Sequence, residues 1–377
     1  MDNTGAGGRM MRAAGFFGLR DVRLIDVPHP GTPGPGEVLI KVAAVGICGS
    51  DHHYYNEGAI GGAVVDEGMI MGHEFSGWIA ETGSGVAHLQ VGELVAVEPA
   101  ISCGTCEFCR KGHPNICPNV LFCGSPDYVG AMADYIRMPA ENCFQLPEDM
   151  TPVEGAMLEP LGVAIHSVDL AHLKVGETVA VLGAGPIGLF TAAMARLAGA
   201  GVVYVTEPVV TRRDFALEYA ADAVFDPSSE HVVDAILQAT AGRGVDVAFE
   251  AAGASDTPDQ AAKVTAPGGK VIVVGIPDDN TMTMTASVVR RKGLTIKVVR
   301  RMKHTYPRAI ELVHSGAVDV ARMATHVFPL DAIKSAFEVV DGYSDGVLRA
   351  VIQVSEQAIG RKSDRARKRE GGKANAE

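Results

Sequence analysis

Four cysteines with short gaps between them lie between residues 103 and 117 of the 377-residue chain. Two residues separate Cys103 from Cys106 and Cys106 from Cys109, and Cys117 follows after a seven-residue gap. Thiolates at such spacings can surround one tetrahedral Zn²⁺, and four protein ligands leave no open position for water. The pattern therefore predicts a structural zinc site. The alternative, a zinc ribbon that binds nucleic acid, would need interleaved basic and aromatic residues that this segment lacks.

A second group of potential ligands is spread over two segments. Cys48, Ser50 and His53 are close together in the sequence. His73 lies 25 residues after Cys48, and Glu74 follows it directly. A cysteine and a histidine at this separation cannot form a local zinc finger, but they can converge from two loops on a catalytic zinc with an open position. Taken singly, these residues have ordinary interpretations as a buried thiol, a core histidine and a solvated glutamate. Together they predict a catalytic metal site.

Glu159 lies in an otherwise apolar segment, directly before Pro160. Burial of an unpaired carboxylate is costly, and a nearby Zn²⁺ would remove that cost. Glu159 is therefore either an acid in the first turn of a helix or a carboxylate drawn inward by a cation. His166, Cys123 and Cys143 are interpreted as ordinary packing residues.

A glycine motif follows the β-branched run at 179–182. It consists of Gly183, Ala184, Gly185, Pro186, Ile187 and Gly188, and residues 189–198 continue it as a predicted helix. In such a strand, turn and helix, the glycines allow a tight turn, the approach of backbone N–H groups to a pyrophosphate and close helix packing. The motif predicts a dinucleotide site.

Glu207 ends the next apolar run, 24 residues after the first glycine of the motif. An acid at this place binds the ribose hydroxyls of NAD in a Rossmann unit. Arg212 and Arg213 follow and could stack on the adenine or accommodate a 2′-phosphate. The negative charge of Glu207 opposes that phosphate, so the predicted cofactor is NAD.

The elements that must position these residues fall into two classes. Residues 11–146 contain short β-type runs between Gly and Pro turns, at 37–45, 75–81, 94–98 and 134–138. After Gly176, predicted strands at 179–182, 202–206, 223–225, 245–250, 270–275 and 294–299 alternate with helical segments such as 212–220 and 232–239. This alternation predicts an α/β fold with a doubly wound parallel sheet. Val274, Gly275 and Ile276 would then lie at its cofactor edge.

Composition excludes several classes of protein. The formal net charge of −12 disfavours nucleic acid or an anionic membrane as the main partner. No secretory segment and no apolar run of spanning length is found, so a cytoplasmic location is expected. Seven cysteines, an odd number, favour metal ligands and free thiols over a disulfide framework. Residues 1–9 and 356–377 are predicted to be disordered tails, the second of them basic.

Taken together, the motifs resemble the zinc-containing medium-chain dehydrogenases, and within them the sorbitol or polyol dehydrogenase branch. The resemblance extends from Met10 to Val354, and its marks are Gly46-Ile-Cys48-Gly-Ser50-Asp51, Gly72-His73-Glu74, the four cysteines, Glu159-Pro160-Leu161 and the glycine motif. It implies a GroES-like, mainly β catalytic domain at 10–165, with a zinc lobe at 100–120 and a return segment at 301–355. It also implies a Rossmann domain at 166–300, an active site in the cleft between the domains, and a homodimer or homotetramer.

The resemblance carries over to the ligands of the catalytic zinc. Cys48 and His73 resemble two of them. Glu74 and Glu159 both match acids that approach the metal in this branch, one directly and the other through water. We expect Glu74 to be the direct ligand and Glu159 to contact the water or the substrate.

Four further residues acquire implied roles. Ser50 resembles a proton-relay hydroxyl and His53 its next step, while Tyr54 and Arg301 resemble residues that line a polyol site. The implied reaction is hydride transfer between a secondary alcohol of a polyol and NAD. A 2,3-butanediol or L-threonine dehydrogenase is the alternative enzyme. A non-catalytic zinc protein that senses NAD is the alternative of another class.

Overall fold

The computed structural model describes residues 9–277 and 280–355. The predicted tail at 356–377 and residues 1–8 of the predicted N-terminal tail lie outside the described residues. Two compact units emerge from the contacts. Of the described residues, the first comprises 9–102, Asn119–Glu159 and 310–355, and the second comprises Cys103–Pro118 and the described part of Pro160–Ala309. The domain limits expected from the sequence stay a prediction.

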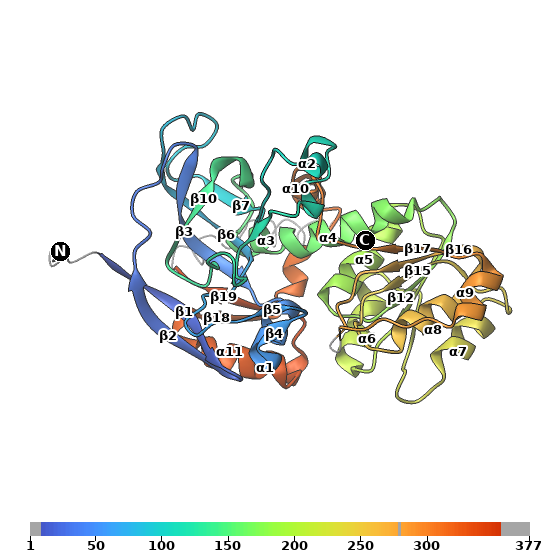
Figure 1. The fold of residues 1–377 in the computed structure, drawn as a ribbon. Coiled ribbons are helices and arrows are strands. Elements are labelled where there is room, and N and C mark those ends of the chain that lie inside the picture. Colours follow the sequence, from blue (N-terminus) through green and yellow to red (C-terminus); the bar gives the residue numbers. More distant parts are fainter. Residues whose placement is uncertain (1–8, 278–279, 356–377) are drawn as a thin grey trace, which may run out of the picture. The chain divides into compact units, whose positions relative to one another are not determined.

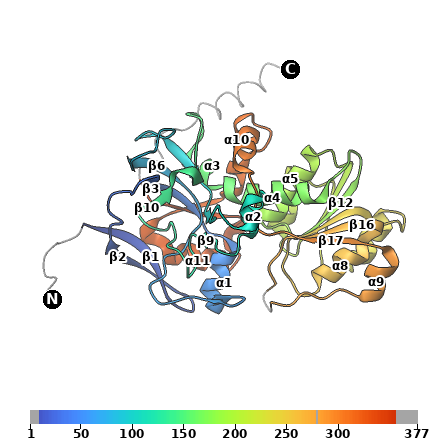
Figure 2. The ribbon, with the colours of Figure 1, turned by 45° about the horizontal axis from the view of Figure 1, so that its top comes forward.

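The first unit is built on a seven-stranded sheet with the order β11-β7-β6-β3-β19-β18, in which β10 also pairs with β3 (Figure 1). A separate antiparallel ribbon joins β1 to β2. The strands of the unit are β1 (Met10–Gly18), β2 (Asp21–Pro28), β3 (Glu37–Gly46), β4 (Ala59–Ile60), β5 (Ala63–Val64), β6 (Glu74–Thr82), β7 (Leu94–Val97), β8 (Ala100–Ile101), β9 (Leu121–Phe122), β10 (Tyr135–Pro139), β11 (Cys143–Gln145), β18 (His326–Pro329) and β19 (Ala350–Gln353). The four predicted β-type runs correspond to β3, β6, β7 and β10. The turned view also shows β3, β6 and β10 close together (Figure 2).

Strand β3 lies at the centre of this sheet because its side chains are apolar on both faces. Eight of its ten residues are buried, which is the pattern of a strand covered on both sides. Strand β19 pairs antiparallel with β3, with Val351 opposite Gly46. Residues 350–353 are therefore an integral part of the first sheet. The helices of the unit are α1 (Gly49–Glu57), α3 (Pro152–Ala156) and α11 (Ile333–Asp341).

The second unit is an α/β structure with a six-stranded parallel sheet of order β14-β13-β12-β15-β16-β17. The order reverses between β12 and β15, and a ligand binds at the carboxyl ends of the strands at such a switch point. The strands are β12 (Thr178–Leu182), β13 (Val202–Thr206), β14 (Ala223–Phe225), β15 (Val245–Glu250), β16 (Thr265–Val273) and β17 (Thr295–Val298). The predicted doubly wound sheet is confirmed. Strand β16 begins before the predicted residue 270, at Thr265, because a register irregularity extends its pairing with β15.

Helices α5 (Pro186–Leu197), α6 (Val210–Tyr219), α7 (Val232–Ala239), α8 (Thr257–Val264) and α9 (Ala286–Lys292) lie along this sheet (Figure 1). The unit also contains α2 (Glu107–Arg110) and parts of α4 (Leu158–Ala171) and α10 (Tyr306–His314), each of which begins in one unit and ends in the other. On one face, Val233 and Ile236 of α7 and Ala261 and Val264 of α8 form a core cluster with strand residues such as Leu182. Their spacing of three residues puts each pair on one side of its helix. Within residues 9–277 and 280–355, no helix is long and apolar enough to cross a membrane.

Candidate metal and dinucleotide sites

Cys48, His73 and Glu74 meet at the end of strand β3. One potential ligand atom from each lies within 4.8 Å of the others. Strand β3 ends at Gly46, helix α1 begins after Cys48, and the pairing of β3 with β6 puts Gly46 opposite Glu74. A Cβ atom at residue 46 would lie 2.3 Å from Glu74 Oε2, so glycine here leaves the room that the carboxylate occupies. The structure therefore brings together residues from two segments that the sequence had linked only by chemistry.

Asp51, which the sequence analysis did not single out for a role, holds the backbone of this cluster in place through hydrogen bonds. Its carboxylate is fully buried and accepts hydrogen bonds from the backbone N–H of Cys48 at 2.9 Å and of Gly72 at 3.2 Å. The Nδ1 atom of His73 lies 3.8 Å from Asp51 Oδ1, and its Nε2 atom lies 3.3 Å from Ser50 Oγ. An acid three residues after Cys48 is a capping pattern that could have identified Asp51.

Arg349 is the second residue that the sequence analysis missed. Its Nη2 atom lies 3.0 Å from Glu74 Oε1, and both side chains are buried. Its Nη1 atom donates to the carbonyl of Ile47. A buried carboxylate needs such a partner. The available signal was a charged residue inside the apolar run 347–352, but nothing in that run names Glu74 as its partner.

The cluster favours a cation on electrostatic grounds. Burial, and then the charge of Glu74, raises the pKa of the Cys48 thiol to about 12. The same two causes raise the pKa of Glu159, in the first turn of α4, well above its usual range. A divalent ion reverses this balance because it stabilises thiolate and carboxylate. Sulfur, nitrogen and oxygen donors from Cys48, His73 and Glu74 fit zinc. The choice between Glu74 and Glu159 as direct ligand stays a prediction.

The four cysteines of the second unit form a compact sulfur cluster. Their Sγ atoms lie within 4.8 Å of one another, and none of the four is in a disulfide. The distances are 3.4 Å for Cys106 to Cys109, 3.8 Å for Cys106 to Cys117 and 3.5 Å for Cys117 to Cys103. Four ligands at a Zn–S distance of about 2.3 Å stand about 3.8 Å apart in a tetrahedron. The cluster therefore fits a closed, structural zinc site.

The glycine motif forms an open cradle after β12. Gly183 has a φ of +100°, and a Cβ atom there would lie 2.9 Å from the backbone of Ala252. A Cβ atom at Gly188 would lie 1.9 Å from the carbonyl oxygen of Gly183. At Gly185 a Cβ atom would meet nothing within 4 Å, so protein packing leaves that space free. Pro186 opens α5 there, and its helix N-terminus suits a pyrophosphate.

Glu207 holds the loop that contains the motif. Its carboxylate accepts from the N–H of Ala184 at 2.8 Å and of Val209 at 3.1 Å. Arg213 faces its own helix start, because it donates to the carbonyl of Glu207 at 2.8 Å and pairs with Asp226 at 3.1 Å. Arg212 is half-buried in the first turn of α6.

The remaining predicted cofactor residues lie at the same strand edge. The backbone N–H groups of Val274 and Gly275 donate to the carbonyl of Glu250, at the end of β15. Ile276 follows with half of its surface exposed. The Glu250 carboxylate in turn binds the N–H of Gly253. Two strand ends are thus tied together where the fold expects a dinucleotide.

The other predicted site residues are placed as follows. His53 Nδ1 lies 3.2 Å from Glu57 Oε1, one turn further along α1, and Tyr54 is buried on the same helix. Arg301 belongs to the second unit and has a φ of +52°. His166 is buried, as a packing residue would be.

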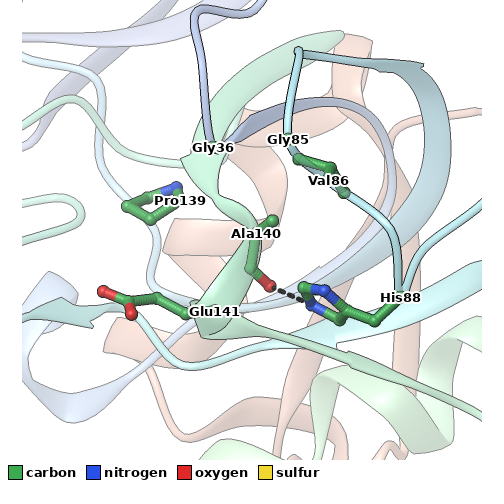
Figure 3. A pocket seen from close by; sticks show the side chains of 7 residues that line it. All are labelled: Gly36, Gly85, Val86, His88, Pro139, Ala140 and Glu141. Carbon is green, nitrogen blue, oxygen red and sulfur yellow. Dashed lines mark hydrogen bonds between the residues drawn. The ribbon is translucent and has the colours of Figure 1, made fainter.

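A pocket of about 360 Å³ in the first unit is lined by seven residues, among which His88 Nε2 lies 3.1 Å from the carbonyl of Ala140 (Figure 3). None of the predicted site residues lines it. This pocket is therefore not the candidate site.

Two family models match the chain. The model described as alcohol dehydrogenase GroES-like domain matches residues 34–148, and that described as zinc-binding dehydrogenase matches residues 186–315. The chain is similar to a sorbitol dehydrogenase of Bacillus subtilis, with 36% identity over 91% of this chain and 97% of the relative. It is also similar to a probable D-xylulose reductase A of Aspergillus clavatus, with 39% identity over 86% of this chain and 91% of the relative.

A solved structure shows the same fold. The crystal structure of 2R,3R-butanediol dehydrogenase from Bacillus subtilis aligns with a TM-score of 0.82 and 31% identity, over 92% of this chain and 100% of the other.

The sulfur cluster should contribute more to stability than to turnover. Replacement C106S removes one of the four thiols that we expect to bind zinc, and metal binding at such sites is coupled to folding. We expect a lower melting temperature and one zinc fewer per chain, with kcat nearly unchanged in the molecules that remain folded. Scanning calorimetry, zinc analysis and kinetics test this. An unchanged melting temperature would argue against a structural metal.

Arg349 should matter most when the catalytic site holds no metal. In R349M the buried Glu74 carboxylate loses its positive partner, and breaking a buried ion pair costs about 3–5 kcal/mol. We expect that loss in chelator-treated protein and a smaller one in zinc-loaded protein, since zinc supplies the missing charge. Denaturant unfolding of wild type, R349M and the control R349K in both states measures it. Equal losses in both states would contradict a metal beside Glu74.

Glu207 should control affinity for the dinucleotide. E207A removes the carboxylate that we expect to bind the ribose, so the KM for NAD should rise by about tenfold, the effect of one charged hydrogen bond. Initial rates with varied NAD and NADP test this, with kcat as the internal control. A wild-type preference for NADP would overturn the assignment of Glu207.

Proposed function

Because the chain belongs to the zinc-binding alcohol dehydrogenase family, we propose that it oxidises a secondary hydroxyl of a polyol such as sorbitol or xylitol, with NAD as hydride acceptor. The chain is thus a zinc- and nicotinamide-dependent oxidoreductase. The observation that carries the proposal is the convergence of donor atoms from Cys48, His73 and Glu74. A sulfur, a nitrogen and an oxygen ligand are three protein ligands, which leaves a zinc position for substrate.

The roles of the cofactors are general to this chemistry. Zinc held by Cys48, His73 and Glu74 would supply Lewis-acid polarisation of a hydroxyl, and the nicotinamide ring would accept hydride. The protein supplies position and charge. Glu74 is held by Arg349, and His73 by its contacts with Asp51 and Ser50.

The proton of the oxidised hydroxyl needs a route to solvent. Ser50 Oγ lies in the catalytic cluster, beside His73 Nε2, and can accept and pass on a proton. His53 is three residues further along α1, and its Nδ1 atom contacts the exposed carboxylate of Glu57. We propose Ser50, His53 and Glu57 as successive proton carriers.

Three residues are proposed to contact the rest of the polyol. Tyr54 lies on α1, and Arg301 lies in the second unit, so their joint role belongs to the proposal. Glu159 is buried in the first turn of α4, and its carboxyl oxygens can accept a hydrogen bond from a hydroxyl or from a water. Several hydrogen-bonding groups of this kind suit a substrate with several hydroxyls.

A 2,3-butanediol is the second candidate substrate, favoured by the similarity to a solved butanediol dehydrogenase. A diol offers two adjacent hydroxyls but none for a distant arginine. A homodimer or homotetramer and a cytoplasmic location are also proposed, on the resemblance.

A substrate screen tests the proposal. Purified protein is mixed with sorbitol, xylitol, 2,3-butanediol or L-threonine and with NAD or NADP, and the absorbance of the reduced cofactor is followed. We expect the highest kcat/KM with a polyol and NAD. The metal content should be near two zinc per chain, whereas one would support a non-catalytic sensor.

The matched control is C48S, which removes one catalytic ligand and leaves the sulfur cluster intact. It should lose more than a thousandfold in kcat, an effect of several kcal/mol, while it still folds and binds NAD. Retained turnover in this variant would reject a zinc-centred reaction.

A further inference from the structure

The segment that contains Arg301 has an unusual backbone. Arg301 and His304 both have a φ of +52°, a left-handed conformation that costs free energy in residues other than glycine. Such a conformation persists only where surrounding contacts hold it. Two sets of contacts surround residues 300–304, and both come from within the second unit.

The first set comes from residues 103–117, the four-cysteine segment. Asn115 Nδ2 donates to the carbonyl oxygen of Arg300 at 3.0 Å, and Asn115 is only 9% exposed. Lys303 Nζ donates to His113 Nδ1 at 3.1 Å. The two bonds fall on either side of Arg301. The four-cysteine segment thus holds the backbone before Arg301 and the side chain two residues after it.

The second set comes from helix α4. Met302 is buried, and a Cβ atom at Gly162 would lie 2.5 Å from its Sδ atom and 2.7 Å from Thr305 Oγ1. Glycine at this helical position therefore lets residues 302–305 pack directly on α4, the helix that begins beside Glu159. Met302 is fixed by its packing on α4, and the carbonyl of Arg300 is fixed by Asn115. Little conformational freedom therefore remains for Arg301 between them.

The sulfur cluster in turn holds Asn115. The backbone N–H of Cys117 donates to the carbonyl of Pro114 at 3.1 Å, which closes the turn that presents the Asn115 side chain. A metal on Cys117 would stiffen that turn. A closed zinc site of this kind has no open position and no chemistry of its own.

We propose that the four-cysteine segment is a positioning device for substrate binding, which sets the affinity for the polyol by holding Arg301 through Asn115. This inference rests on the proposed contact between Arg301 and a distant polyol hydroxyl. Asn115 touches neither substrate nor cofactor, so it is a positioning residue. Loss of the Asn115 side chain should raise the KM for long polyols, and it should leave kcat and the KM for NAD unchanged.

The test compares N115A and R301A with a matched control, T265V. Thr265 is in the same unit, fully buried, and likewise donates its side-chain proton to a backbone carbonyl, that of Ala261 at 2.7 Å. It lies at the start of β16, the end opposite to the cofactor edge. We measure kcat, the KM for sorbitol, 2,3-butanediol and NAD, zinc per chain, and hydrogen exchange of residues 300–304.

We expect N115A to raise the sorbitol KM by about 2- to 10-fold, the range of one net hydrogen bond. The butanediol KM should change less, because a four-carbon diol has no distant hydroxyl for Arg301. Exchange at 300–304 should accelerate while two zinc ions per chain remain. T265V should lower stability without any of these changes. If N115A loses zinc or misfolds, N115D keeps the side-chain size, removes the donor and should give the same KM shift.

Two outcomes separate the proposals. If R301A raises the sorbitol KM but N115A changes neither that KM nor the exchange of 300–304, the positioning role of the four-cysteine segment is refuted. If R301A leaves the sorbitol KM unchanged while N115A accelerates exchange, the proposed substrate contact is refuted although the structural coupling holds.

Discussion

The first unit depends on a buried carboxylate that needs positive charge around it. Glu74 has no exposed surface, and its protein partner is Arg349, close to the far end of the described chain. The missing side chain at Gly46 makes room for it, and Asp51 holds the neighbouring backbone. Each of these features is costly or useless alone. Together they make sense if a cation completes the cluster beside Cys48 and His73.

The second unit follows a different constraint, which is to leave space for a ligand rather than to fill it. Packing requires glycine at 183 and 188, whereas Gly185, between them, faces an open volume. Backbone hydrogen bonds tie the strand edges nearby, and the Glu207 carboxylate binds the N–H of Ala184, so the cradle is formed before any ligand arrives. Such preorganisation lowers the entropy that binding must overcome.

The sequence predicted best those features that depend on local spacing. We could predict the four cysteines, the glycine motif and the alternation of strands and helices from the sequence. Each of these signals depends only on residues that are close together in the chain. Cys48 and His73 could be joined only through their chemistry and the family resemblance. Arg349 and the pairing of β19 with β3 could not be found, because hydrophobic pattern does not name a partner far along the chain. The attachment of residues 103–118 to the second unit was likewise beyond the pattern.

The place of β19 in the first sheet has a consequence for biosynthesis. Residues 44–46 of β3 pair with β19, about 300 positions later, so this part of the β3 edge stays unpaired until almost the whole described chain has left the ribosome. Residues 37–41 of β3 can pair with β10 earlier. The strands of the parallel sheet, from Thr178 to Val298, emerge well before β19. Closing so long a loop is slow, and an unsatisfied strand edge invites aggregation. We therefore expect the second, dinucleotide-binding unit to fold first. The first unit must then avoid aggregation either by binding chaperones or by folding quickly once β19 has emerged.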